Sequence, residues 1–167
     1  MIEVKDVKRL GKLKEDENLR FRQFLKINAD EDELDKQFKE LHNKYFKIYD
    51  CKKCRNCCKE LGTVIKEDEL DAITKTLHID KKKFKKKYLE EDDDRYKFKT
   101  KSCQFLNNNN CKVKKCLPKS CKDYPFTDKE DRLYSMYSII GNASICPVVY
   151  EILEELKKEY NFRWKYI

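Results

Sequence analysis

The feature that most constrains this chain is a dense run of cysteines near its middle. Four thiols fall within eight residues, in the run Cys51-x-x-Cys54-x-x-Cys57-Cys58. Five more follow downstream, at Cys103, Cys111, Cys116, Cys121 and Cys146. A two-residue gap lets neighbouring thiolates turn toward one ion, so this spacing is typical of metal-binding loops. We therefore expect a fold organised around thiolate-bound metal.

Composition favours the same interpretation, because the chain is too polar for a large apolar core. Of its 167 residues, 40% are apolar and 42% are charged. That length corresponds to one ordinary domain, or to one domain with a helical extension. A metal that binds only the native state adds its binding free energy to folding. Bound metal would thus compensate for the small core.

Targeting features point to a cytoplasmic protein. The first residues contain no continuous apolar run typical of a signal peptide, and no later stretch is long enough to cross a membrane. Thiols stay reduced in the cytosol, and the odd number of cysteines also favours metal over disulfides. Abundant Lys and Glu with only three Gly is a composition seen in hyperthermophiles, whose intracellular proteins sometimes form disulfides. Disulfides therefore stay the alternative.

The net charge gives only a weak indication of a partner. The formal charge is +8 with neutral cysteines. Eight thiolates and two zinc ions would reduce it to about +4. The most basic run, 81–87, is followed closely by the acidic run 90–94, and no RNA-stacking motif is present. The sequence thus gives no strong signal for nucleic-acid binding, we expect no membrane partner, and an unknown protein partner stays open.

The pattern of apolar residues predicts a mainly α protein. Residues 1–50 are expected to form a helical extension, broken near Ala29 and restarted at Asp30 as N-cap with Glu33 three residues on. An apolar stripe follows at helical spacing, formed by Leu34, Phe38, Leu41, Tyr45 and Ile48. Residues 51–167 are expected to form the metal-binding domain, with an irregular cysteine-rich core and a C-terminal helix.

Within the second domain we expect helices over 67–77 and 81–89 and a helix that starts at Pro147. Residues 63–65 form a short apolar run, predicted as a strand or as a turn into the next helix. A short strand is predicted over 96–99, and 132–140 is predicted as strand or buried loop. The four asparagines 107–110 predict a turn, because asparagine tolerates left-handed backbone. Cys103 and Cys111 flank this turn, which would bring their sulfurs together. Pro147 would place the Cys146 thiol at a helix N-terminus, where the dipole favours thiolate.

Taken together, the cysteine run, Cys103-Gln-Phe-Leu, Cys111-Lys-Val, the segment from Pro118 to Phe126 and Cys146-Pro147 resemble the CxxCxxCC (YkgJ-like) family of zinc- or iron-chelating domains. The resemblance covers about residues 51–147. It implies eight metal-binding cysteines, namely Cys51, Cys54, Cys57, Cys58, Cys103, Cys111, Cys121 and Cys146.

Two positions depart from the family pattern. Members commonly have Arg-Pro before the seventh cysteine, and here Leu117 takes the place of the arginine. Cys116 is an additional thiol that could serve as a substitute ligand, as a reactive thiol or as a small buried apolar side chain, and we expect the last of these. The two histidines, His42 and His78, are not expected to bind metal: the first is expected at the surface or its boundary, and the second at a helix end.

Cysteine-only sites suit both zinc and iron–sulfur clusters. The Cys-x-x-Cys-x-x-Cys run with a distant Cys-Pro, and the near absence of histidine, favour an iron–sulfur cluster, of the 4Fe-4S type. Two four-cysteine zinc sites, which would use all eight family cysteines, are the alternative.

Three functions stay open on the sequence alone. The first is a metalloprotein with a redox or metal-handling role. The second is a metal-dependent protein-modifying enzyme, because lysine N-methylases that act on flagellin carry a similar cysteine cluster in a longer chain. The third is a structural zinc module that binds an acidic partner. Glycine occurs only at 11, 62 and 141, so a glycine-rich cofactor loop is absent from the sequence.

Overall fold

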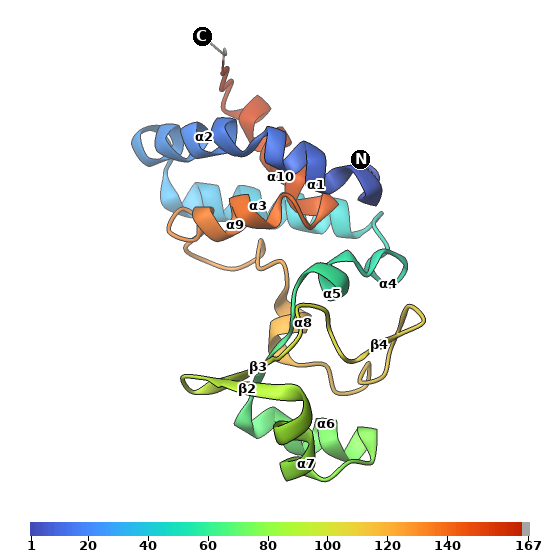
Figure 1. Cartoon of the computed structure of the whole chain (residues 1–167). Coiled ribbons are helices and arrows are strands. Elements are labelled where there is room, and N and C mark those ends of the chain that lie inside the picture. Colours follow the sequence, from blue (N-terminus) through green and yellow to red (C-terminus); the bar gives the residue numbers. More distant parts are fainter. Residues whose placement is uncertain (165–167) are drawn as a thin grey trace. The chain divides into compact units, whose positions relative to one another are not determined.

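The computed structural model describes residues 1–164 and divides the chain into two compact units. The first unit combines Met1–Asp50 with the segment from Pro125 onward, and the second is Cys51–Tyr124. Figure 1 shows the first unit in blue, cyan, orange and red, and the second from green to light orange. The first unit is therefore assembled from both ends of the chain.

The first unit is a helical bundle with a well-buried apolar core. Its helices are α1 (Val4–Leu13), α2 (Glu15–Asn28), α3 (Glu31–Phe46), α9 (Met136–Asn142) and α10 (Pro147–Glu159). Helix α10 packs against α1, α3 and α9. The side chains that fill this core include Phe21, Leu25, Leu34, Phe38, Ile152, Leu153 and Leu156. These residues lie at helical spacing on their own helices, so each helix buries one face.

Local signals for α3 are confirmed at its start and fail at its end. The Asp30 side chain accepts a hydrogen bond from the backbone N–H of Glu33 at 3.0 Å, as an N-cap does. Leu34, Phe38 and Leu41 are buried. Ile48 was expected to continue the stripe, but it is 74% exposed, because the helix ends at Phe46.

The prediction of strand or buried loop over 132–140 is wrong for residues 136–140, because Met136–Asn142 forms helix α9. Met136, Ile139 and Ile140 lie at helical spacing and are all buried. Helix α9 packs against α2, where the Arg22 guanidinium lies 3.9 Å from the centre of the Tyr137 ring. Tertiary packing has thus overridden the strand propensity of a stretch rich in isoleucine and tyrosine.

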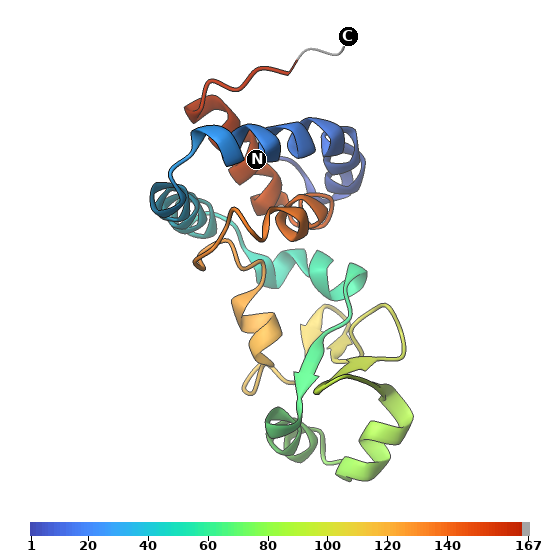
Figure 2. The same cartoon turned by 90° about the vertical axis from the view of Figure 1, so that its left-hand side faces the viewer.

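The second unit combines short helices with two small antiparallel sheets. In chain order its elements are α4 (Cys51–Cys54), α5 (Asn56–Glu60), β1 (Val64–Lys66), the 3₁₀ helix η1 (Glu67–Glu69), α6 (Leu70–Leu77), α7 (Lys81–Tyr88), β2 (Leu89–Asp92), β3 (Arg95–Phe98), β4 (Leu106–Asn107), β5 (Asn110–Cys111) and α8 (Lys119–Asp123). The strand order of the larger sheet is β1-β3-β2, and β4 pairs with β5. Helix α6 packs against α7, and α7 packs against β2. Figure 1 and Figure 2 show this arrangement in two views that differ by a rotation of 90°.

This unit has its own small core, formed by Ile65, Leu70, Ile73, Phe84, Leu89, Phe98, Phe105 and Val113. Several thiols border that core: Cys103, Cys111 and Cys116 are partly buried and pack against it. Apolar side chains and sulfur atoms therefore share the interior of this unit.

The asparagine turn is confirmed in detail. Strands β4 and β5 are joined by Asn108 and Asn109, whose φ angles are 44° and 64°. Two successive left-handed residues are the backbone that a tight two-residue hairpin requires, and asparagine tolerates it better than most residues. Leu106 is paired with Cys111 in this hairpin.

The fold class is confirmed as mainly α with short antiparallel strands. The expected boundary after residue 50 coincides with a boundary between the compact units, but helix α10 packs in the first unit, whereas the expected domain was 51–167. Its apolar face meets α3, which explains that placement. Residues 165–167 of the expected domain lie outside the described residues. Which residues form the metal-binding domain in the functional sense stays a prediction.

Candidate metal centre

The cysteine run 51–58 is split into two short helices. Arg55 adopts left-handed backbone, with φ 53°, and stands as the N-cap of α5. Its guanidinium Nε donates to the backbone oxygen of Asn109 at 3.3 Å, and the Asn109 side chain donates to the backbone oxygen of Lys53 at 3.3 Å. The hairpin turn thus holds the break between Cys54 and Asn56 in place.

Backbone contacts bring the end of this run to the downstream thiols. The N–H of Cys103 donates to the carbonyl oxygen of Cys58 at 2.8 Å. The N–H of Lys112, next to Cys111, donates to the carbonyl oxygen of Phe105 at 2.9 Å. The hairpin and the loop that precedes it are therefore tied directly to α5.

A third segment, at α8, contributes Cys121. The Oγ1 of Thr63 and the Sγ of Cys121 are 2.7 Å apart, and Thr63 Oγ1 also lies 3.2 Å from Ser120 Oγ. Ser120 in turn donates to the backbone oxygen of Val64 at 2.6 Å. These hydroxyls fix α8 against β1 and place hydrogen-bonding groups beside the Cys121 sulfur.

The Cys58 thiol is set up to ionise. A hydrogen bond from Cys57, together with the positive charge of Arg55 and a hydrogen bond from its guanidinium, outweighs burial and lowers the pKa of Cys58 to about 6. Cys58 would therefore be a thiolate at neutral pH, the form that binds metal.

Two neighbouring thiols have the opposite tendency. Burial, followed by repulsion from Cys58, Cys121 and Cys111, raises the pKa of Cys103 to about 12. Burial likewise raises the pKa of Cys121, although hydrogen bonds from Thr63 and Ser120 favour its thiolate and the residue as a whole is exposed. These mutual repulsions show that four thiols from separate segments share one neighbourhood. We call Cys58, Cys103, Cys111 and Cys121 the thiol tetrad.

The donor set of the tetrad fits zinc or iron. Four thiolates suit zinc and iron–sulfur clusters equally. Repulsion among thiolates is one of the causes that raise the pKa of Cys103 and Cys121, and a nearby cation would offset it. Among residues 1–164, no group of three or more Cys, His, Asp or Glu side chains is already arranged to hold a metal ion. The tetrad is thus defined by its electrostatic coupling and its chemistry.

The other predicted ligands have different surroundings. Cys57 lies beside the tetrad through its hydrogen bond to Cys58. The Sγ of Cys54 accepts from the backbone N–H of Asn56 at 3.5 Å, and Cys51 is exposed. None of the nine cysteines, all within the described residues, is joined in a disulfide.

Cys146 belongs to the first unit and caps helix α10. It is 7% exposed, and Pro147 is the first residue of that helix, as the sequence predicted. The expected position at a helix N-terminus is therefore confirmed. Its membership of the ligand set stays a prediction.

The two departures from the family pattern contribute to packing. Leu117 packs against the apolar core of the second unit, as does Cys116. The Cys116 thiol donates to the backbone oxygen of Ala72 at 3.6 Å and lies 3.2 Å from Thr76 Oγ1. Cys116 therefore contacts α6 and is only partly buried, where a fully buried position was expected.

The histidines have other partners or positions. His42 Nδ1 lies 2.9 Å from Thr127 Oγ1, and burial lowers the pKa of His42. The ring is half-buried in the first unit, which agrees with the expected boundary position. His78 is the C-cap of α6 and has left-handed backbone, which confirms its predicted position at the end of a helix.

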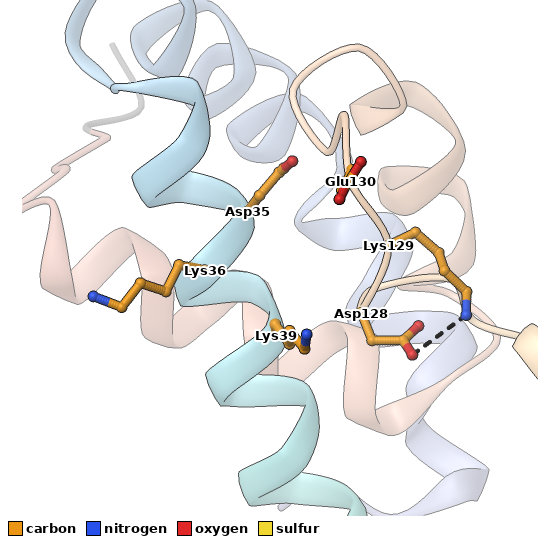
Figure 3. Close-up of a pocket in the computed structure, with 6 residues that line it drawn as sticks. All are labelled: Asp35, Lys36, Lys39, Asp128, Lys129 and Glu130. Carbon is orange, nitrogen blue, oxygen red and sulfur yellow. Dashed lines mark hydrogen bonds and ion pairs between the residues drawn. The ribbon is translucent and has the colours of Figure 1, made fainter.

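A cavity of about 570 Å³ in the first unit has a different chemistry (Figure 3). It is lined by Asp35, Lys36, Lys39, Asp128, Lys129 and Glu130. The Asp35 carboxylate accepts from the backbone N–H groups of Asp131 and Arg132, at 2.7 and 2.8 Å. The cavity is lined by three acidic and three basic side chains, so its charges balance. Together with the hydrogen bonds of Asp35, this indicates a structural contact between α3 and the loop 128–132.

Sequence reasoning missed the residues that support the thiols. Arg55 lies inside the cysteine run, and its positive charge was the available indication. Thr63 was assigned to a short apolar run, and Ser120 received no role. The spacing of residues in the sequence could not identify Thr63 or Ser120 as supporting residues. Their arrangement around Cys121 depends on how α8 packs against β1.

Comparison with protein families identifies the family to which this chain is similar. The family model CxxCxxCC, described as a "putative zinc- or iron-chelating domain", matches residues 50–146. No curated protein and no solved structure matches the chain significantly. No helix among residues 1–164 is both long and apolar enough to cross a membrane.

Proposed function

Because the chain belongs to the CxxCxxCC family of zinc- or iron-chelating domains, we propose that the thiol tetrad is its principal metal centre. The observation that carries this proposal is the convergence of the segments: the Cys103 N–H donates to the Cys58 carbonyl oxygen at 2.8 Å, on the loop that leads into the hairpin of Cys111. Repulsion from Cys58, Cys121 and Cys111, among the causes that raise the pKa of Cys103, agrees with it. Four donors from three separate segments are enough to complete a tetrahedral thiolate site or to hold one cluster. Arg55, Thr63 and Ser120 would stabilise the thiolates.

An iron–sulfur cluster is our first choice for the bound group, of the 4Fe-4S type, with a redox or metal-handling role. The cysteine-only donors and the cysteine spacing support this choice. A bound cluster would supply one-electron transfer. A structural zinc site is the second candidate, favoured by the match between four thiols and the coordination number of zinc. Cys51, Cys54, Cys57 and Cys146 are proposed as further metal ligands.

The test is elemental analysis with visible absorption spectroscopy on protein purified without oxygen. A brown protein that contains iron and bleaches on reduction would establish the cluster. A colourless protein with stoichiometric zinc would establish the second candidate. A protein that takes up neither metal would contradict the proposal.

Matched variants locate the centre. We expect Cys103→Ala to weaken metal affinity by at least about tenfold, because it removes a tetrad thiol. Cys116→Ala is the control, since that thiol packs against the same core but contacts α6. Equal metal content in both variants would exclude the tetrad as the binding site.

A further inference from the structure

The positive charge of this chain is concentrated on the segments that carry the tetrad. Segments 51–60 and 101–124 contain ten Lys and Arg residues and two Asp and Glu residues. The whole chain contains 39 basic and 31 acidic residues, so the remainder is balanced at 29 of each. The two segments alone account for the formal charge of +8.

The structure leaves most of these charges exposed. The two acidic residues of the segments already have partners: Glu60 pairs with Lys101 at 3.4 Å, and Asp123 with Lys119 at 2.7 Å. Six other lysines are exposed and form no ion pair with a carboxylate in the described part of the chain: Lys53, Lys59, Lys112, Lys114, Lys115 and Lys122. We call these six residues the basic rim.

The rim residues lie on segments that are held together. The backbone of Lys53 accepts a hydrogen bond from Asn109, and Lys112 follows directly on the same hairpin. Lys59 is next to Cys58, whose carbonyl oxygen accepts from Cys103. Lysines of both segments therefore lie next to tetrad thiols in the sequence, on backbone segments of the second unit that these hydrogen bonds hold together.

Bound metal would not neutralise the rim. Four thiolates with one divalent ion, or with one 4Fe-4S cluster in its +2 state, carry about two negative charges. Eight thiolates with two divalent ions would carry about four, so at least half of the eight positive charges would remain. A surface that keeps such an excess attracts an acidic partner and accelerates its association.

The rim lacks two features that nucleic-acid-binding surfaces commonly have, and this favours a protein as the partner. Its segments contain two aromatic residues, Phe105, which is buried, and Tyr124, which is half-buried, so the rim has no exposed ring on which a base could stack. The helices of these segments, α4, α5 and α8, have four or five residues, too few for a recognition helix in a DNA groove.

We propose that the basic rim is a docking surface for an acidic protein. The partner would present a cluster of Asp and Glu side chains and would bind beside the tetrad. This goes beyond the proposed function, because the surface is defined by lysines whichever metal is bound.

The test measures binding of a fluorescent poly-L-glutamate, by anisotropy, at low and at physiological ionic strength. The rim variant carries Lys112→Glu, Lys114→Glu and Lys115→Glu. The control variant carries Lys82→Glu, Lys83→Glu and Lys86→Glu on α7, where three exposed lysines undergo the same change in charge. Metal content is measured for each protein, so that loss of metal is distinguished from loss of binding.

We expect the rim variant to bind poly-L-glutamate at least about tenfold more weakly than the control variant. Equal weakening would show that only net charge matters and would overturn the proposal, as would absence of binding by the unmodified protein. Tighter binding of single-stranded DNA of equal length, lost in the rim variant, would replace it with a nucleic-acid surface. If charge reversal removes the metal, the corresponding Lys→Gln variants provide the same comparison.

Discussion

At the scale of single residues, the tetrad combines a thiol that ionises readily with thiols that do not. Cys58 has a hydrogen bond from Cys57 and the Arg55 guanidinium nearby, whereas Cys103 is buried among other thiols. Cys58 would therefore be the first ligand available to a metal ion. Cys103 and Cys121 would lose their protons only when a cation is present.

This difference predicts the pH dependence of alkylation in the metal-free protein. Thiolates react with iodoacetamide and thiols do not. Labelling of Cys58 should rise with a midpoint near its pKa of about 6, while Cys103, with a pKa of about 12, stays unlabelled at neutral pH. Mass spectrometry of the labelled peptides gives both midpoints.

The lowered pKa of Cys58 can be tested with two cysteine variants, and it also makes the stability of the protein depend on pH. Cys57→Ala should move the Cys58 midpoint upward, because it removes the largest cause of the lowered pKa, and Cys116→Ala should leave it unchanged. Because the folded-state pKa of Cys58 lies below the usual 9.0, its stabilising contribution is complete above about pH 9 and is lost as the pH falls through about 6. An unchanged midpoint in Cys57→Ala would contradict this account of Cys58.

Cys146 provides a second test at this scale. We expect Cys146→Ala to lower metal occupancy, because a thiolate at a helix N-terminus is a favourable ligand. Elemental analysis is the measurement. Full loading of the variant would remove Cys146 from the ligand set and leave it as a buried cap of α10.

At the scale of elements, close packing between helices places strong demands on a few positions. Gly11 lies in α1 against the segment that follows α9, and a Cβ atom there would come within 2.5 Å of the Ser144 Cα and 2.6 Å of the Ala143 oxygen. Both are backbone atoms, so the clash can be relieved only if α1 or the segment after α9 moves. Gly141, in α9, has no atom within 4 Å of the same added carbon.

These two glycines form a matched pair of substitutions. Gly11→Ala should lower the free energy of unfolding by about 1–3 kcal/mol, as overpacking does. Gly141→Ala should raise it by about 0.5–1 kcal/mol, because alanine is the better helix former. Urea denaturation of both variants measures the difference, and equal stability would contradict the close approach at α1.

The elements also show where sequence patterns suffice. Asp30 was a recognisable cap, and its side chain accepts a hydrogen bond from the backbone N–H of Glu33. Asp80 caps α7 in the same way, by accepting from the backbone N–H of Lys83. The asparagine turn could be identified because it depends on local backbone preference alone. Helix α9 could not, since its residues favour a strand and its packing against α2 and α10 is not visible in the sequence.

At the scale of the whole molecule, the chain builds two separate apolar cores of unequal character. The first unit closes its core with long helices, while the second combines a small core with thiols. Spacing in the sequence and the family resemblance predicted eight metal-binding cysteines, and this ligand set stays a prediction. Spacing could not predict that Cys58, Cys103, Cys111 and Cys121 are the coupled set, because this depends on the break at Arg55 and on how three segments meet.

The two cores predict an uneven response to metal removal. Chelation should destabilise the second unit, because metal binding energy contributes to its folding. Hydrogen exchange followed by mass spectrometry should show faster exchange around Phe98 and Val113. Protection around Ile152 and Leu153 in the first unit should change little, and an equal loss in both units would contradict this division.

The central claim is that thiolates of the tetrad bind the metal, and X-ray absorption at the metal edge tests it most directly. For protein purified without oxygen, we predict a first shell of sulfur atoms, at about 2.3 Å if the metal is zinc. A first shell made of nitrogen or oxygen atoms, with sulfur absent, would contradict the account.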